Sequence, residues 1–147
     1  MTSFLLSEAS GWLIVVLALF TITIPFLVRG RRLAPEGWGV GYLQRLAPHY
    51  WIGYSIAGLS ALHATFAMSA PMPNGSGFQA GLWFAAGGML LAFGQVSLGV
   101  RLRSLRGTGR LRLRRWHFAG MAGLAAVGGL HVWFNGALVH AISGLPL

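Results

Sequence analysis

Cysteine is absent from this chain of 147 residues, and charge is scarce: 9% of the residues are charged and only two are acidic. The lack of cysteine excludes a disulfide scaffold and any cysteine-ligated zinc or iron–sulfur site. The two acids, Glu8 and Glu36, flank the apolar stretches, so no serine–histidine–acid hydrolase site is available. An ordinary soluble domain is about 25% charged. A chain that is 55% hydrophobic instead favours a single integral membrane domain over residues 1–147.

Four long apolar stretches follow one another along the chain. Each holds about the 20 residues that an α-helix needs to cross roughly 30 Å of hydrocarbon. In lipid, a helix satisfies its backbone hydrogen bonds internally. The predicted fold class is therefore all-α, an integral membrane four-helix bundle running up-down-up-down. The predicted helices cover residues of about 10–29, 48–70, 77–101 and 114–142.

The basic residues are all arginines, and they occur in two of the three connections between the apolar stretches. The first connection has Arg29, Arg31, Arg32 and Arg45, and the third has the other seven, between residues 101 and 115. The net charge of +9 would suit nucleic acid, but this clustering is typical of cytoplasmic loops, so no nucleic acid is expected. We predict a multi-pass protein of the bacterial inner (cytoplasmic) membrane, with its arginine-rich loops in the cytoplasm and both termini outside.

Four of the five histidines repeat one spacing. His49 and His63 are 14 residues apart, and so are His117 and His131, whereas His140 fits neither pair. At about 100° and 1.5 Å per residue, 14 residues return to within about 40° of the same helix face and advance roughly 21 Å. That separation is too long for one metal ion to join both histidines of a helix.

The up-down-up-down topology makes the second and fourth helices run in the same direction. His49 and His117 then share one depth, and His63 and His131 share another. Two neutral imidazoles facing each other at one level are the axial arrangement of six-coordinate haem iron, and helical bundles hold cofactors in this way. A histidine in a membrane helix can also serve as a hydrogen-bonded packing residue. We predict two stacked haems between the second and fourth helices.

Small residues lie on both histidine faces. They leave room for a flat macrocycle against the backbone, although small residues also let membrane helices pack closely. The two segments align with each other, histidine on histidine, which suggests an internal repeat of two hairpins. The predicted cofactor-facing glycines are Gly53, Gly120 and Gly128.

The pattern resembles a di-haem transmembrane b-type cytochrome over about residues 10–142. Respiratory cytochrome b carries His-x13-His pairs on the second and fourth helices of a four-helix core. The ferric reductase-like transmembrane domain has similar pairs on two helices that enter from the cytoplasm. Here Arg45 precedes His49, and the run Leu113-Arg114-Arg115-Trp116-His117 opens the fourth stretch. Since both ligand helices begin on the arginine side, the ferric reductase-like family is the better match.

The resemblance implies transmembrane electron transfer through two haem b groups, in a subunit of a larger membrane redox complex such as those of respiratory chains. His49 and His117 would ligate the inner haem iron, and His63 and His131 the outer one. The chain would be an electron-transfer component of an oxidoreductase rather than a complete enzyme. Its expected partners are other subunits and the lipid bilayer, with quinone as an open alternative.

Other side chains would support these haems. The inner propionates would pair with Arg45, Arg114 or Arg115, although control of membrane topology alone also explains arginines there. Each histidine would donate its second ring nitrogen to a carbonyl or a hydroxyl oxygen. Ser60 and Thr65 are the candidate hydroxyls.

The chain departs from the ferric reductase-like pattern in three ways. It has four apolar stretches where six-helix members have more, it has no glycine fingerprint of a flavin or nicotinamide domain, and its second histidine spacing is often one residue shorter in that family. It therefore needs a partner to supply or accept electrons. Two other interpretations stay open: a quinone-reactive anchor of a dehydrogenase with one haem, and a non-redox transporter or scaffold whose histidines relay protons.

Overall fold

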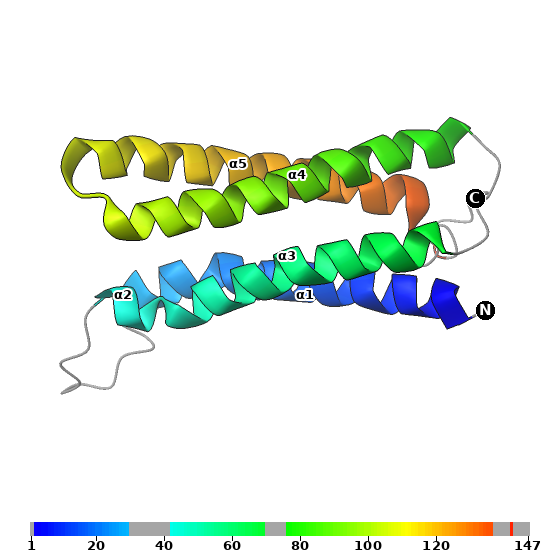
Figure 1. Cartoon of the computed structure of the whole chain (residues 1–147), viewed down its shortest axis with the longest axis horizontal. Helices are drawn as coiled ribbons and strands as arrows, with labels where there is room; N and C mark the ends of the chain where they lie inside the picture. Colours follow the sequence, from blue (N-terminus) through cyan, green and yellow to red (C-terminus); the bar gives the residue numbers. More distant parts are fainter. Residues whose placement is uncertain (1, 30–41, 70–75, 137–141, 143–147) are drawn as a thin grey trace.

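The computed structural model describes residues 2–29, 42–69, 76–136 and 142. The described part is all-helical, and a short helix, α2 (Tyr42–Arg45), leads into one of four long helices (Figure 1). The predicted all-α, four-helix fold class is confirmed. The long helices are α1 (Thr2–Arg29), α3 (Ala47–Met68), α4 (Ser76–Ser104) and α5 (Gly107–Asn135).

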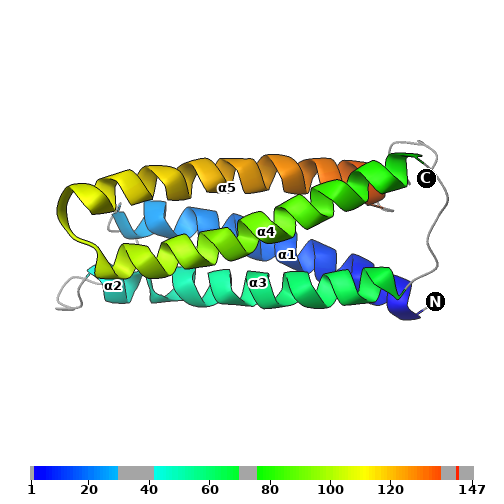
Figure 2. The same cartoon turned by 45° about the horizontal axis from the view of Figure 1, so that its top comes forward.

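The long helices form two antiparallel hairpins, α1 with α3 and α4 with α5 (Figures 1 and 2). The hairpins meet chiefly where α3 packs against α4, whereas α3 and α5 make at most a few close backbone contacts. Both α3 and α5 begin at the end of the bundle where α4 ends, so they run in the same direction, as predicted (Figure 1). Side chains, rather than close backbone approach, therefore make the contact between the two histidine-bearing helices.

Three helical segments are long and apolar enough to cross a membrane: Ser3–Val28, Gln79–Ser104 and Gly107–Asn135. α3 has 22 residues, which at 1.5 Å per residue is about 33 Å, but it is not among these three segments. Three of the four predicted spans are thus supported by length and composition. That α3 also crosses the membrane stays a prediction.

Many large apolar side chains point outward from the bundle. Trp83 is 79% exposed, Leu90 73% and Trp51 71%. In a soluble protein, residues of this kind would form the core. Apolar surface on this scale needs covering, by lipid or by another subunit. The buried hydrophobic side chains in the described part of the chain are small in number: Ile24, Val28, Leu46, Ile56, Ala57 and Ala92.

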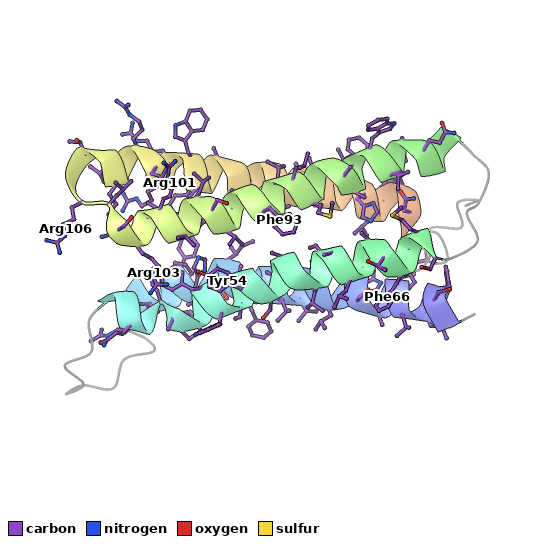
Figure 3. The ribbon with its side chains drawn as sticks, viewed as in Figure 1. Tyr54, Phe66, Phe93, Arg101, Arg103 and Arg106 are labelled. Atoms are coloured by element: carbon purple, nitrogen blue, oxygen red, sulfur yellow. The ribbon has the colours of Figure 1, made fainter. Side chains whose placement is uncertain are left out.

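The arginine-bearing connection between α4 and α5 is shorter than the sequence predicted. The prediction left an open connection between residues 101 and 114, but α4 continues to Ser104 and α5 begins at Gly107. Arginine is a good helix former, so both helices extend past their apolar parts. Gly107 has a φ of 67°, a conformation that glycine adopts without steric cost, and this allows the sharp reversal. Figure 3 shows three of the arginines at this end, Arg101, Arg103 and Arg106.

The other helix boundaries also differ from the predicted ones. α1 begins at Thr2 rather than near residue 10, so Glu8 lies within the helix. α5 ends at Asn135, and most of the remaining predicted stretch, residues 137–141, lies outside the described residues.

Candidate cofactor site

Two pairs of histidine rings meet between the hairpins. The ring centroids of His49 on α3 and His117 on α5 are 6.2 Å apart, with an interplanar angle of 74°. The centroids of His63 and His131 are 6.0 Å apart, at 82°. The structure thus brings the four predicted ligands together in the two predicted pairs, one at each level of the bundle. Their role as ligands stays a prediction.

Helix α1 holds both histidines of α3. Nδ1 of His49 donates to the carbonyl oxygen of Thr21 at 2.8 Å, and the Thr21 hydroxyl donates to the His49 carbonyl oxygen at 3.2 Å. Nδ1 of His63 donates to the carbonyl oxygen of Ser7 at 3.0 Å, and Oγ of Ser10 lies 3.1 Å from the same nitrogen. Because a backbone carbonyl can only accept, each Nδ1 carries a proton, and in the neutral ring Nε2 then keeps its lone pair.

Helix α4 provides a carbonyl acceptor for one of the two histidines of α5. Nδ1 of His131 donates to the carbonyl oxygen of Gly81 at 3.0 Å. A Cβ at position 81 would overlap the side chain of Asn135, so only glycine fits there without a shift. At the other level, Nδ1 of His117 is buried and makes no hydrogen bond. Three of the four rings therefore have Nδ1 held by a carbonyl of the same hairpin.

The hydroxyls named from the sequence do not support the imidazoles. Ser60 donates to the carbonyl oxygen of Ile56 at 2.8 Å, and Thr65 to that of Ala61 at 3.0 Å. Both hydroxyls bond to the carbonyl four residues earlier in α3, which is the local partner that serine and threonine find within a helix. The prediction of Ser60 and Thr65 as partners was wrong. The observed partners come from α1 and α4.

Two glycines that the sequence analysis did not single out lie against the histidine rings. A Cβ at Gly11 would lie 3.1 Å from Cε1 of His63, and one at Gly99 would lie 3.9 Å from Cε1 of His117. The first distance is tighter than an ordinary van der Waals contact. Helix α1 can therefore lie this close to His63 because residue 11 has no side chain. These residues were missed because the sequence analysis considered only the histidine-bearing helices.

The three predicted cofactor-facing glycines have different surroundings. A Cβ at Gly53 or Gly128 would meet no atom within 4 Å, so both border open space. At Gly120, the amide nitrogen of Gln95 occupies the place where a Cβ would stand. Glycine at position 120 therefore makes room for Gln95, and the place of all three beside a cofactor stays a prediction.

The arginine side chains that the structure describes gather at the end of the bundle nearer the His49–His117 pair. Arg45 is half-buried, whereas Arg114 and Arg115 are exposed and come just before His117 in α5. An anionic group at this level would find cations to pair with. Of the other residues named from the sequence, the side chain of Arg29 and all of Arg31, Arg32 and His140 lie outside the described part.

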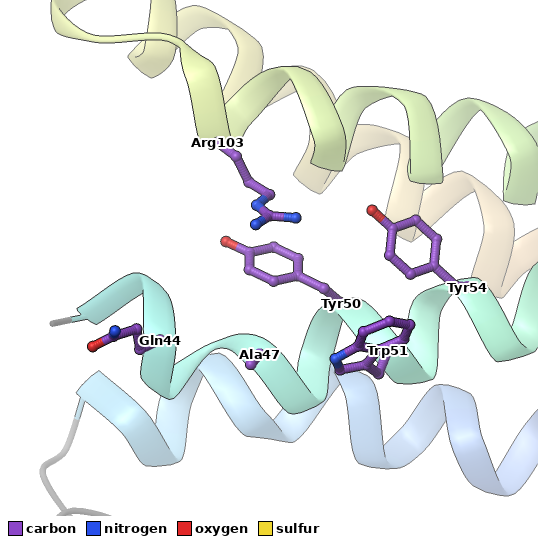
Figure 4. A pocket seen from close by; sticks show the side chains of 6 residues that line it. All are labelled: Gln44, Ala47, Tyr50, Trp51, Tyr54 and Arg103. Carbon is purple, nitrogen blue, oxygen red and sulfur yellow. The ribbon is translucent and has the colours of Figure 1, made fainter. Parts of the chain in front are cut away.

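A pocket of about 470 Å³ opens at this end of the bundle (Figure 4). The guanidinium carbon of Arg103 on α4 lies 5.0 Å from the ring centroid of Tyr50 on α3, which is a cation–π contact between the hairpins. The Tyr50 ring centroid is 5.8 Å from that of His49. The pocket is lined by Gln44, Ala47, Tyr50, Trp51, Tyr54 and Arg103.

The separation of the rings in each pair bears on whether a metal ion could lie between them. Two imidazoles that ligated one metal ion through bonds of about 2.0 Å would have ring centroids roughly 6 Å apart. The observed 6.2 Å and 6.0 Å are close to this value. Rings in simple contact also lie about 4.5–7 Å apart. The hydrogen bond from Nδ1 to a carbonyl oxygen, which in the neutral ring leaves Nε2 able to ligate, is therefore the more specific observation.

The number of ligands also fits haem. Within the described ranges, no three histidine, cysteine, aspartate or glutamate side chains come together. A zinc site formed by protein ligands usually has three or four of them. Two histidines suffice for haem, because the macrocycle itself supplies four nitrogens. The residues present therefore fit one such group at each level.

Comparison of this chain with family models, with curated proteins and with solved structures found no match.

Proposed function

We propose that this chain carries electrons across a membrane through two bis-histidine haem b groups, as a subunit of a larger membrane redox complex. The observation that carries the proposal is the repeated histidine pair between parallel helices, with three of the four Nδ1 atoms donating to carbonyl oxygens. Metal-ligating histidines almost always donate their second ring nitrogen in this way. A histidine that only packs also needs a hydrogen-bond partner, so the support comes from bonded Nδ1 atoms together with facing rings at two levels.

The chain's own residues would hold the cofactors in place. Nε2 of His49 and His117 would ligate one iron, and Nε2 of His63 and His131 the other. The carbonyl hydrogen bonds fix the tautomer of the ring and its rotation about the side chain. Bound haem supplies a one-electron carrier, whose potential depends on its axial ligands, hydrogen bonding and burial. In this proposal the flat rings would lie beside Gly53 and Gly128, which border open space.

The arginine side chains favour one orientation of the bundle, and of its two proposed haem sites, in the membrane. Arg45, Arg114 and Arg115 would pair with propionates at the His49–His117 level. The same arginine-rich end would face the cytoplasm of a bacterial cell. The exposed apolar side chains of the bundle would contact lipid and partner subunits. Those partners would supply and accept the electrons.

The haem content of the purified chain tests the proposed function. A pyridine haemochrome assay is expected to give protohaem at two per chain, with a reduced b-type absorption spectrum. One haem per chain would instead favour the single-haem, quinone-reactive anchor. Protein purified from haem-replete cells without any haem would contradict the proposal and favour a non-redox scaffold or transporter.

Labelling of single cysteines tests the orientation, because the natural chain has no cysteine to interfere. Gln79 and Thr108 are exposed residues near opposite ends of the α4–α5 hairpin. A membrane-impermeant maleimide is expected to label Gln79→Cys in intact cells, and Thr108→Cys only after the membrane is permeabilised. The reverse pattern would place the arginine-rich end outside, and equal labelling of both would contradict a membrane-spanning hairpin.

A further inference from the structure

The first hairpin has a regular antiparallel register at its histidines. Thr21 faces His49, and Ser7 faces His63, in each case through the carbonyl that accepts from Nδ1. Ser7 and Thr21 are 14 residues apart, which is also the spacing of the two histidines. Since both helices advance at the same rise per residue, one contact in such a pair predicts the position of the next.

The second hairpin repeats this register. Gly81 faces His131 through the equivalent carbonyl, and the residue 14 positions further along α4 is Gln95. The residue 14 positions before His131 in α5 is His117. Gln95 therefore lies opposite His117, in the position that Thr21 has opposite His49 in the first hairpin.

Two contacts agree with this register. The amide nitrogen of Gln95 reaches α5 at Gly120, three residues after His117. The ring of His117 reaches α4 at Gly99, four residues after Gln95. Each side chain thus crosses the helix interface within about one turn of the other.

Each of these two side chains also has a buried atom without a hydrogen-bond partner in the described structure. The atoms are Nδ1 of His117, which can donate, and Oε1 of Gln95, which can only accept. Buried polar atoms are nearly always paired in folded proteins. A hydrogen bond between this donor and this acceptor, which belong to the two helices of one interface, would satisfy both requirements.

We propose that Gln95 is the positioning residue of His117, accepting a hydrogen bond from Nδ1–H at its side-chain carbonyl. No hydrogen bond joins the two side chains in the structure, where the Gln95 amide nitrogen lies against Gly120, so the bond requires the Gln95 side chain to turn towards the imidazole. The oxygen and nitrogen of an amide are nearly equal in size, so either atom can be presented to the ring. The bond gives His117 the tautomer that backbone carbonyls give to the other three histidines. Nε2 of His117 is then the nitrogen with the lone pair, on the ring that meets His49.

Reduction potentials of the full-length chain test this role, and this part of the test rests on the proposed function. Loss of the acceptor in Gln95→Leu makes the imidazole a weaker electron donor, so the potential of the His49–His117 haem is expected to rise. The anionic acceptor in Gln95→Glu is expected to lower it. The potential of the His63–His131 haem is expected to stay unchanged in both variants.

The matched control is Ser97→Leu, because Ser97 is an exposed residue of α4 whose hydroxyl bonds to its own helix at Phe93. It is expected to leave both potentials unchanged. A purely structural role for Gln95 would shift the potential in the same direction in Gln95→Leu and Gln95→Glu. That outcome, or a Gln95→Leu potential equal to that of Ser97→Leu, would overturn the proposal.

The Nδ1 proton of His117 gives a measurement that does not depend on reduction potentials. In the full-length chain with ¹⁵N-labelled histidine, measured in the reduced state and assigned with His117→Gln, the Nδ1 proton of His117 is expected to have the low-field chemical shift of a hydrogen-bonded N–H. Ligation through Nε2 by itself keeps Nδ1 protonated, so the readout is the shift of this proton. Gln95→Leu is expected to lose the low-field shift and Gln95→Glu to restore it. A natural chain with two haems whose Nδ1 proton shift equals that of Gln95→Leu would refute the bond. A chain without haem that shows the low-field Nδ1 proton would refute the proposed function and retain the bond.

Discussion

Replacing His63 with alanine is expected to lower the haem content from two to one per chain, or to convert one haem from six-coordinate low-spin to five-coordinate high-spin. The reason is the pairing of His63 with His131 at a ring-centroid distance of 6.0 Å. Removal of one ring leaves its partner as a single axial ligand. His131→Ala is expected to give the same result, measured by pyridine haemochrome and by electron paramagnetic resonance.

The double variant His63→Ala/His131→Ala gives a sharper test. Residues that act as a unit have non-additive effects, so the double variant is expected to lose one haem and no more. A cross-pair variant, His63→Ala/His117→Ala, is expected to affect both haems, because it removes one ligand at each level. His140→Ala is the control of the same residue type and is expected to keep both. Equal haem loss in the same-pair and cross-pair variants would contradict the assignment of pairs.

Replacing Gly11 with valine is expected to remove or distort the haem held by His63 and His131. A Cβ at position 11 would lie 3.1 Å from Cε1 of His63, and valine adds two methyl groups beyond it. The ring cannot easily give way, because Nδ1 is held by the carbonyl oxygen of Ser7. Overpacking of this kind typically costs about 1–3 kcal/mol. The expected readouts are a loss of one haem, or a shift in its spectrum, together with a lower thermal unfolding temperature in detergent.

Gly58→Val is the matched control for this prediction. Gly58 belongs to the same hairpin, but a Cβ there would meet no atom within 4 Å. The control therefore changes a membrane-helix glycine to the same β-branched residue without crowding a ring. It is expected to keep both haems and nearly the natural unfolding temperature. Equal losses in Gly58→Val and Gly11→Val would show that valine disturbs the helices in general rather than the contact with His63.

The internal repeat explains why the two sites have related but unequal surroundings. At three histidines the acceptor is a backbone carbonyl, whose position is set by the helix itself. At His117 the proposed acceptor is the side chain of Gln95. A substitution can remove a side-chain acceptor but not a backbone one. The proposed haem at the His49–His117 level is therefore the one whose histidine is expected to lose its hydrogen bond when a single side chain of α4 is replaced.

Much of the architecture could be predicted from the sequence because it depends on local periodicity. The four apolar stretches predicted the long helices, and the spacing of 14 residues placed His49 with His63, and His117 with His131, on one face of each helix. The shared direction of α3 and α5 followed from counting the predicted membrane-spanning stretches along the chain. The extent of the helices was less predictable, since arginines between residues 101 and 115 suit both a polar loop and a helix that extends past the membrane.

The sequence by itself determined which histidines form pairs and at which two levels of the bundle they lie. The tertiary structure determined what touches them: the carbonyls of Ser7, Thr21 and Gly81, and the close approach of Gly11. The reason is that helix periodicity is a property of each segment alone, whereas the register between helices depends on the packing of all their side chains together. Ser60 and Thr65 looked suitable within α3, but the imidazoles bond to neighbouring helices that local spacing does not reveal.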